Sequence, residues 1–284
     1  MPEIFTSEPF EYVAGGLDLV GERWDGDPDR ATVVLLHGGG QTRHSWRHTA
    51  ARLAAGGRSV VALDARGHGD SQWDPAGDYL LDAFVADLST YLESSERSAV
   101  LVGASLGGMI ALVTAAEHPE WVAGLVLVDV VLELEREGVE KIRRFMGSYP
   151  NGFSSLDEVA DAVAAYNPHR ERPRNLDGLR KNVRLGDDGR WRWHWDPAFV
   201  DLGDEPQRRS DPKRLRRAAE EVRAPTLIVR GADSDVVSQA GLDDMARMMP
   251  DAEFAEVGAA GHMVAGDDND VFGDALEHYL EQIS

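Results

Sequence analysis

Short apolar runs separated by longer amphipathic stretches are the feature of this 284-residue sequence that most limits its fold. Runs that are apolar at consecutive positions are typical of strands buried on both faces of a sheet. The intervals between them are long enough for crossover helices, so the alternation predicts parallel β-α-β units. The runs begin at Thr32, Ser59, Ser98, Ala123, Thr226 and, more weakly, Ala252.

The segment before the first of these runs predicts a β-hairpin. In residues 10–24, Gly15 and Gly16 supply a turn between two strand-like segments. This hairpin would add antiparallel strands to one edge of a mainly parallel sheet flanked by helices. The helices are expected at residues 46–55, 80–91, 106–117, 242–249 and 270–283.

A change in composition marks an insertion in the sheet pattern. Between residues 132 and 215 the apolar runs stop, and arginine, proline and aromatic residues accompany helical patterns. The strand pattern resumes at Thr226 and continues to the end of the sequence. We therefore predict a core formed by residues 1–131 and 216–284, interrupted by a helical lid at residues 132–215.

The charge balance limits the partners of the chain. Asp and Glu number 50 against 29 Lys and Arg, a formal net charge of -21. Such a field repels nucleic acid phosphates and anionic lipid surfaces, so we expect neither nucleic acid nor membrane as a partner and favour a neutral, apolar small molecule. The sequence has no apolar run of roughly 18 residues and no secretory signal pattern, which predicts a cytoplasmic protein. It also has no cysteine, which excludes thiolate catalysis.

The motif Gly103-Ala104-Ser105-Leu106-Gly107 carries the strongest chemical signal. It follows an apolar strand pattern and precedes a helical one, the context of a nucleophile on a sharp strand-to-helix turn. Such a turn needs small neighbours because the backbone is tight and the helix packs closely. The sequence therefore predicts Ser105 as a nucleophile, with helix N–H groups nearby for a developing oxyanion.

Four motifs occur in an order that resembles the α/β-hydrolase superfamily: HGGG at 37–40, DARGHGDS at 64–71, GASLGG at 103–108 and GHMVAGD at 261–267. Over residues 32–131 and 225–284 the chain is most similar to the lidded esterase, cofactor-free haloperoxidase and epoxide-hydrolase-like branch. The resemblance implies an α/β-hydrolase fold with a mainly parallel eight-stranded sheet. It also implies chemistry that requires neither a metal ion nor another cofactor.

The resemblance assigns roles to residues on separate loops. His262 follows the last predicted strand and is the expected general base, which places the triad in the order serine, acid, histidine. The oxyanion hole is expected from the N–H groups of Gly39 and Leu106. His37 is expected to be a structural hydrogen-bonding residue.

Three aspartates compete for the position of the triad acid. The loop GADSDVVS, after the strand from Thr226, contains Asp233 and Asp235. Its sequence resembles that of family members in which the aspartate before two valines is the triad acid. Asp235 is therefore the predicted acid, with Asp233 as a turn or helix cap. Asp129 is the third candidate, because some lipase-like relatives place their acid after the preceding strand.

The predicted activity is hydrolysis of a carboxylic ester or related acyl substrate through an acyl-enzyme, by a carboxylesterase-like enzyme. Perhydrolase or haloperoxidase activity with the same triad and a ligand-binding receptor with vestigial turnover are the alternatives. Trp46, Trp193 and Met263 are the candidate pocket residues, although Trp46 and Met263 could equally belong to the core, and Trp193 to the packing of the lid.

Overall fold

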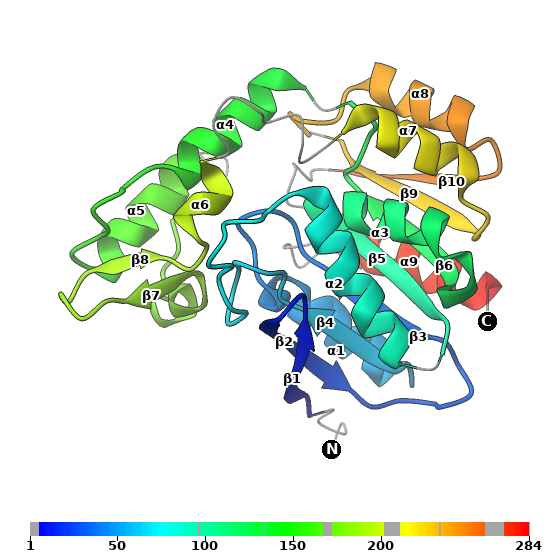
Figure 1. The fold of residues 1–284 in the computed structure, drawn as a ribbon. Coiled ribbons are helices and arrows are strands. Elements are labelled where there is room, and N and C mark those ends of the chain that lie inside the picture. The colour runs from blue at the N-terminus through cyan, green and yellow to red at the C-terminus, as the bar shows by residue number, and fades with distance from the viewer. Residues whose placement is uncertain are drawn as a thin grey trace.

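A twisted eight-stranded sheet forms the centre of the molecule (Figure 1). The computed structural model describes residues 6–95, 97–133, 135–166, 172–201, 211–232, 234–258 and 270–283. The strand order is β1-β2-β4-β3-β5-β6-β9-β10, and every pair from β4 to β10 is parallel. The strands of this sheet are β1 (Glu8–Ala14), β2 (Leu17–Trp24), β3 (Thr32–Leu36), β4 (Val60–Leu63), β5 (Ala99–Ala104), β6 (Val122–Val128), β9 (Thr226–Gly231) and β10 (Glu253–Val257).

The predicted hairpin is confirmed. Gly15 and Gly16 have φ angles of 59° and 77°, a backbone conformation that glycine adopts without steric cost. They join β1 to β2, whose register runs from Glu8 opposite Arg23 to Ala14 opposite Leu17. Strand β2 also pairs antiparallel with β4, so the hairpin forms one edge of the sheet.

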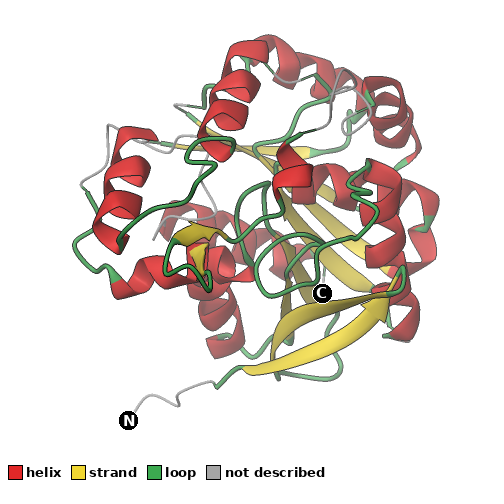
Figure 2. Ribbon diagram, turned by 60° about the vertical axis from the view of Figure 1, so that its left-hand side comes forward, coloured by secondary structure: helices red, strands yellow, loops and turns green. Residues whose placement is uncertain are grey.

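Helices cover both faces of the sheet (Figure 2). On the central strand β3, Val34 and Leu36 belong to one hydrophobic cluster, whereas Val33 and Leu35 belong to another on the opposite face. This double burial is what an uninterrupted apolar run predicts. The α-helices are α1 (Arg47–Ala55), α2 (Leu81–Ser94), α3 (Leu106–Glu117), α4 (Arg136–Met146), α5 (Leu156–Tyr166), α6 (Pro197–Val200), α7 (Pro212–Glu221), α8 (Gln239–Met248) and α9 (Asp270–Gln282).

The insertion after β6 contains strands as well as helices. Helices α4 and α5 are followed by the 3-10 helix η3 (Asp177–Asn182), the antiparallel pair β7 (Val183–Leu185) and β8 (Trp191–Trp193), and then α6. These elements extend to one side of the sheet domain in Figure 1. Helix α7 instead packs on α3 of the core, so position 215 lies within a core helix. Within the described residues, no helix is both long and apolar enough to cross a bilayer.

Candidate active site

Ser105 occupies the sharp turn between β5 and α3. Its backbone has φ 48° and ψ -114°, which is a strained conformation for a residue with a side chain. Its N–H donates to the Val128 carbonyl at 3.1 Å, and its carbonyl accepts from the Met109 N–H at 3.0 Å. The turn is therefore held by the adjacent strand and by the first turn of the helix, as a nucleophile elbow requires.

The glycines around Ser105 are required by close backbone contacts. A Cβ atom on Gly103 would lie 2.3 Å from the Gly107 carbonyl oxygen, and one on Gly107 would lie 2.3 Å from the Leu36 carbonyl oxygen. Both distances are far shorter than a van der Waals contact. The small residues of the motif thus allow α3 to start directly against β3 and β5.

The glycine loop after β3 lies beside Ser105. A Cβ on Gly38 would be 3.4 Å from the Ser105 Cβ, and the Gly38 N–H donates to the Gln41 side chain at 2.9 Å. Within the described part of the chain, neither the Gly39 nor the Leu106 N–H has a hydrogen-bond acceptor. Two unpaired N–H groups flanking a strained serine are what an oxyanion hole needs.

His37 is a structural residue of this loop, as its place in the sequence predicts. The Ala65 N–H donates to its Nε2 atom at 3.0 Å. In a neutral ring the proton is then on Nδ1, which donates to the Gly38 carbonyl at 2.8 Å. Burial lowers the pKa of His37, so the imidazole stays neutral and joins the glycine loop to the end of β4.

Asp129 lies next to the elbow at the end of β6. Its carboxylate is buried, with 1% of the residue exposed, and its φ angle is 54°. The Ser234 hydroxyl donates to Oδ2 at 2.6 Å, and the Gly231 N–H donates to Oδ1 at 3.3 Å. Asp129 directly follows strand β6 and Ser105 directly follows β5, and these two strands are hydrogen-bonded neighbours.

Asp235, the acid expected from sequence, has a different environment. Its side chain is 46% exposed and forms an ion pair with Lys141 of α4, with 2.6 Å between Nζ and Oδ2. The backbone of α4 comes close at this point, since a Cβ on Gly138 would lie 2.4 Å from the Asp235 carbonyl oxygen. Asp235 therefore connects the insertion to the core. Asp233, His262 and Met263 lie outside the described residues.

The two tryptophans expected near the substrate are packed into separate cores. Trp46 is fully buried between the sheet and its covering helices, with its ring 6.1 Å from that of Phe272 in α9. Trp193 stacks on Trp195 at 4.9 Å and meets Phe153 edge to face at 4.9 Å. Both tryptophans thus occupy the packing positions that sequence left as the alternative.

His194, to which the sequence drew no attention, holds the insertion against the glycine loop. The Gly69 N–H donates to its Nδ1 atom at 2.8 Å, so Nε2 carries the proton and donates to the Gly40 carbonyl at 3.3 Å. His194 is 1% exposed, and its burial lowers the pKa to about 3. Close by, the Asp196 N–H donates to the Gly67 carbonyl at 2.9 Å.

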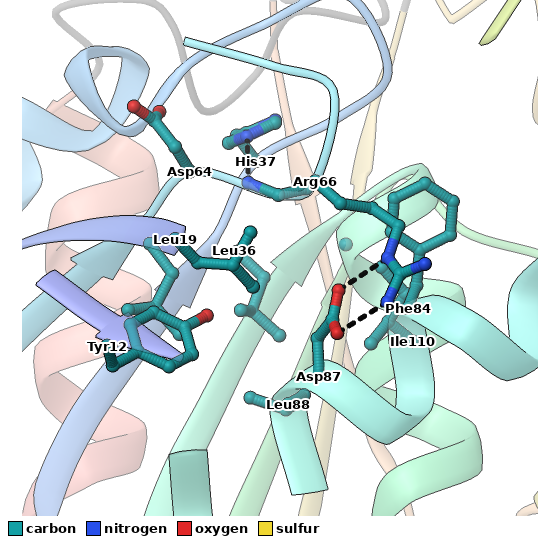
Figure 3. A pocket seen from close by; sticks show the side chains of 13 residues that line it. Tyr12, Leu19, Leu36, His37, Asp64, Arg66, Phe84, Asp87, Leu88 and Ile110 are labelled. Carbon is teal, nitrogen blue, oxygen red and sulfur yellow. Dashed lines mark hydrogen bonds and ion pairs between the residues drawn. The ribbon is translucent and has the colours of Figure 1, made fainter. Parts of the chain in front are cut away.

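A small pocket lies beneath the elbow, between α2 and the hairpin (Figure 3). Tyr12, His37 and Gly107 border it, and on its α2 side Arg66 donates two hydrogen bonds of 2.6 Å to the Asp87 carboxylate. Burial raises the pKa of Asp87, while the Arg66 hydrogen bonds oppose that shift.

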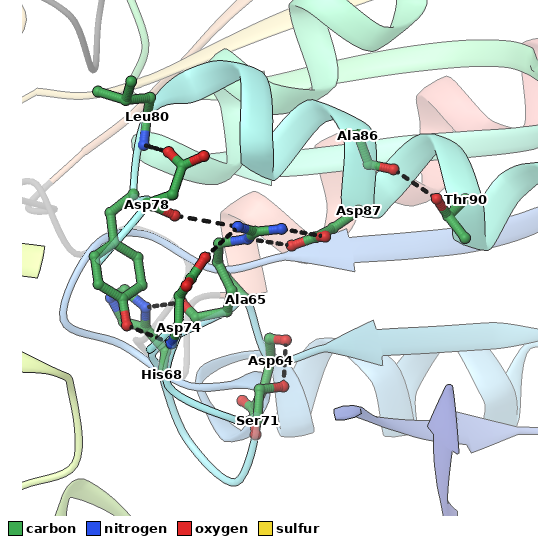
Figure 4. A network of polar contacts seen from close by, with 12 residues as sticks. Asp64, Ala65, His68, Ser71, Asp74, Asp78, Leu80, Ala86, Asp87 and Thr90 are labelled. Atoms are coloured by element: carbon green, nitrogen blue, oxygen red, sulfur yellow. Dashed lines mark hydrogen bonds and ion pairs between the residues drawn. The ribbon is translucent and has the colours of Figure 1, made fainter. Parts of the chain in front are cut away.

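Further hydrogen bonds of Arg66 hold the loop after β4 at Asp74 and Asp78, which Figure 4 labels. Arg66 also donates to Asp74 at 3.0 Å and to the Asp78 carbonyl at 3.1 Å. Tyr79 in this loop donates to Asp196 of the insertion at 2.6 Å. The network therefore supports the backbone that carries Gly67 and Gly69.

Comparison with known proteins assigns the family. Residues 31–268 match the model of the alpha/beta hydrolase fold family. The chain belongs to the α/β-hydrolases. It is 33% identical over 222 residues to the esterase Rv0045c of Mycobacterium tuberculosis, a match that covers 76% of this chain and 70% of the esterase.

Further α/β-hydrolases match over most of the chain. The 3-hydroxybutyrate-oligomer hydrolase of Cupriavidus necator is 28% identical over 253 residues, with 84% of each chain covered. The crystal structure of an α/β hydrolase from Novosphingobium aromaticivorans has a TM-score of 0.82 and 27% identity, and the match covers 97% of this chain and 98% of that one. These α/β-hydrolase relatives support a hydrolase activity for this chain.

Proposed function

We propose that this protein is a serine esterase that cleaves carboxylic esters or related acyl substrates through a covalent acyl-enzyme. The observation that carries the proposal is the strained backbone of Ser105, together with the N–H groups of Gly39 and Leu106, which have no acceptor among the described residues. A strained turn persists only when its surroundings hold it, and it exposes the serine hydroxyl to a substrate. The relatives named as an esterase and as a 3-hydroxybutyrate-oligomer hydrolase support the proposal.

In the proposed mechanism, Ser105 Oγ attacks the acyl carbonyl and gives its proton to His262. The carbonyl oxygen becomes an oxyanion, which the Gly39 and Leu106 N–H groups stabilise without reorganisation. The C–O bond to the alcohol then breaks, and His262 returns the proton to the departing alkoxide. Water, deprotonated by the same imidazole, attacks the acyl-enzyme and releases the carboxylic acid and free Ser105.

For the triad acid we favour Asp129 over Asp235. A triad acid holds the imidazole in one tautomer and stabilises its cation, which a buried and hydrogen-bonded carboxylate does well. Asp129 is such a carboxylate, and its strand adjoins that of Ser105. Asp235 is half-exposed and paired with Lys141, so its charge is already balanced by a cation of the lid.

The test is the variant Ser105→Ala, with Ser94→Ala on the exposed end of α2 as its control. Turnover of short-chain p-nitrophenyl esters and labelling by a fluorophosphonate are measured for both variants and for the unmodified protein. We expect Ser105→Ala to lose labelling and at least about 10³-fold in kcat, whereas Ser94→Ala keeps both. Esterase rates unchanged in Ser105→Ala would refute the proposal. Labelling of the unmodified protein without turnover of any acyl substrate would instead identify a receptor.

A further inference from the structure

A second, polar pocket lies where the insertion meets the core, beside His194. Five segments line it: η1 (Arg43–Trp46), the loop that contains Gly69, η3, β7 and the segment after β8 that contains His194. Cations dominate its lining, namely Arg43, Arg180, Lys181 and Arg184, and Asp70 is the acidic residue among the described lining residues. The lining of this pocket is thus mainly positive, whereas the whole chain has a formal net charge of -21.

Two of the four cations already have carboxylate partners. Arg43 pairs with the buried Asp64, and with Asp70 at 2.8 Å. Arg180 pairs with the exposed Asp177 at 3.1 Å and lies over the Trp191 ring, 5.0 Å from its centroid. These contacts fix the two guanidinium groups at the wall.

The other two cations have no carboxylate within 4.0 Å in the part of the chain that the structure describes. Arg184 donates to the Gly69 carbonyl and lies over the Trp73 ring, 5.4 Å from its centroid. Partial burial, followed by the nearby Arg47 charge, lowers the pKa of Lys181. Arg184 is therefore positioned by uncharged groups. No carboxylate of the described residues neutralises either side chain, so both offer a cation to a ligand.

We infer that this pocket binds a small oxyanion, a carboxylate or a phosphoryl group. Arginine presents a planar fork of N–H donors that matches such groups in pairs, and lysine adds a point charge. The backbone and aromatic contacts of Arg184 hold its side chain in place, which reduces the entropy lost on binding. A bound oxyanion would also join η3 and β7 of the insertion to η1 of the core.

The experiment measures binding apart from catalysis. Isothermal titration of the Ser105→Ala protein is carried out with succinate and with inorganic phosphate, at constant ionic strength, and with neutral succinamide as the uncharged comparison. The Ser105→Ala background prevents turnover, so the result does not depend on the proposed esterase mechanism. The two anions show which kind of oxyanion the pocket takes.

Lys181→Met and Arg184→Met are the test variants, and Arg172→Met is the matched control. Arg172 is a lid arginine that pairs with Asp157 and Asp161 on α5. We expect at least one anion to bind, each test variant to weaken it about tenfold, and Arg172→Met to leave it unchanged. Binding of neither anion, equal binding by both test variants and the unmodified site, or an equal loss in Arg172→Met would overturn the inference. Among the described residues, the Lys181 side chain forms no hydrogen bond, so its variant should fold even if Arg184→Met does not.

Discussion

The insertion meets the core on two sides of the elbow, and the two contacts differ in kind. On the side of the proposed oxyanion hole (the oxyanion side), His194 and Asp196 are buried and hydrogen-bond to the backbone of Gly40, Gly69 and Gly67. On the side of the candidate triad acids (the acid side), the described residues form a half-exposed ion pair between Lys141 and Asp235. Loss of a buried hydrogen bond lowers the free energy of unfolding more than loss of an exposed ion pair does. The stability of the oxyanion side should therefore depend far more on its contact with the insertion.

The largest expected effect is the difference in kcat between variants of Asp129 and Asp235, the two described aspartates of the acid side. Asp129→Asn keeps the shape of a buried side chain but removes the charge that stabilises an imidazolium, so kcat should fall by about 10⁴-fold. Asp235→Asn breaks only an exposed ion pair and should change kcat less than about threefold. Steady-state ester hydrolysis measures both variants. A greater loss in Asp235→Asn would restore the acid expected from sequence.

Lowering the pH should reduce the stability that His194 gives to the oxyanion side. Its pKa is about 3 in the folded protein, against about 6.5 in an unfolded chain. The unfolded state therefore binds more protons between these values, so the stability from the neutral ring is complete above pH 6.5 and is lost as the pH falls toward 3. His37, also buried with a lowered pKa, acts in the same direction.

Urea unfolding from pH 7 to pH 4 measures this effect. The free energy of unfolding should fall by up to about 1.4 kcal/mol per pH unit from His194 alone. The variant His194→Leu cannot titrate, so its stability should fall less steeply than that of the unmodified protein. Parallel pH curves for the two proteins would contradict a neutral, buried His194.

At pH 7 the same variant should show the cost of an unpaired backbone donor. His194→Leu leaves the Gly69 N–H without its acceptor, which should lower the free energy of unfolding by about 2 kcal/mol. Ester turnover should fall as well, because the Gly40 carbonyl that accepts from His194 directly follows Gly39 of the proposed oxyanion hole. Urea unfolding and kcat are the two measurements. A variant as stable as the unmodified protein would show that the histidine does not anchor the lid.

The smallest effect is expected on the acid side. Lys141→Met removes the ion pair with Asp235 and should change the free energy of unfolding by less than about 1 kcal/mol. The change should shrink further in high salt, because exposed charges are screened. Thermal unfolding at low and high salt checks both statements. If Lys141→Met lowered the free energy of unfolding as much as His194→Leu, the two contacts would contribute equally to stability.

The sheet and the sharp turn at Ser105 could be predicted from the sequence because each depends on residues that are close together in the chain. The apolar run from Thr32 marks a strand buried on both faces, and the glycines around Ser105 mark a tight turn. Both follow from the residues of a single segment. The hairpin at Gly15 and Gly16 was predictable for the same reason.

The side-chain environments could not be predicted because they depend on distant segments. Asp235 is exposed beside Lys141 because α4 crosses its loop, and Trp46 is covered by Phe272 from the other end of the chain. His194 lies in a segment where alternating tryptophans dominate the pattern, and its acceptor and donor partners are backbone groups more than 100 residues away. Contacts between such distant segments cannot be predicted from the spacing of residues in a single sequence.

The place of the insertion has a consequence for how such a protein can diversify. It departs after β6 and the chain returns to β9, and these two strands are direct hydrogen-bonded neighbours. Inserting or deleting residues there breaks no ladder and shifts no register. Exchange of the whole segment with that of another family member is therefore a route to new selectivity that leaves Ser105, the proposed nucleophile, in place.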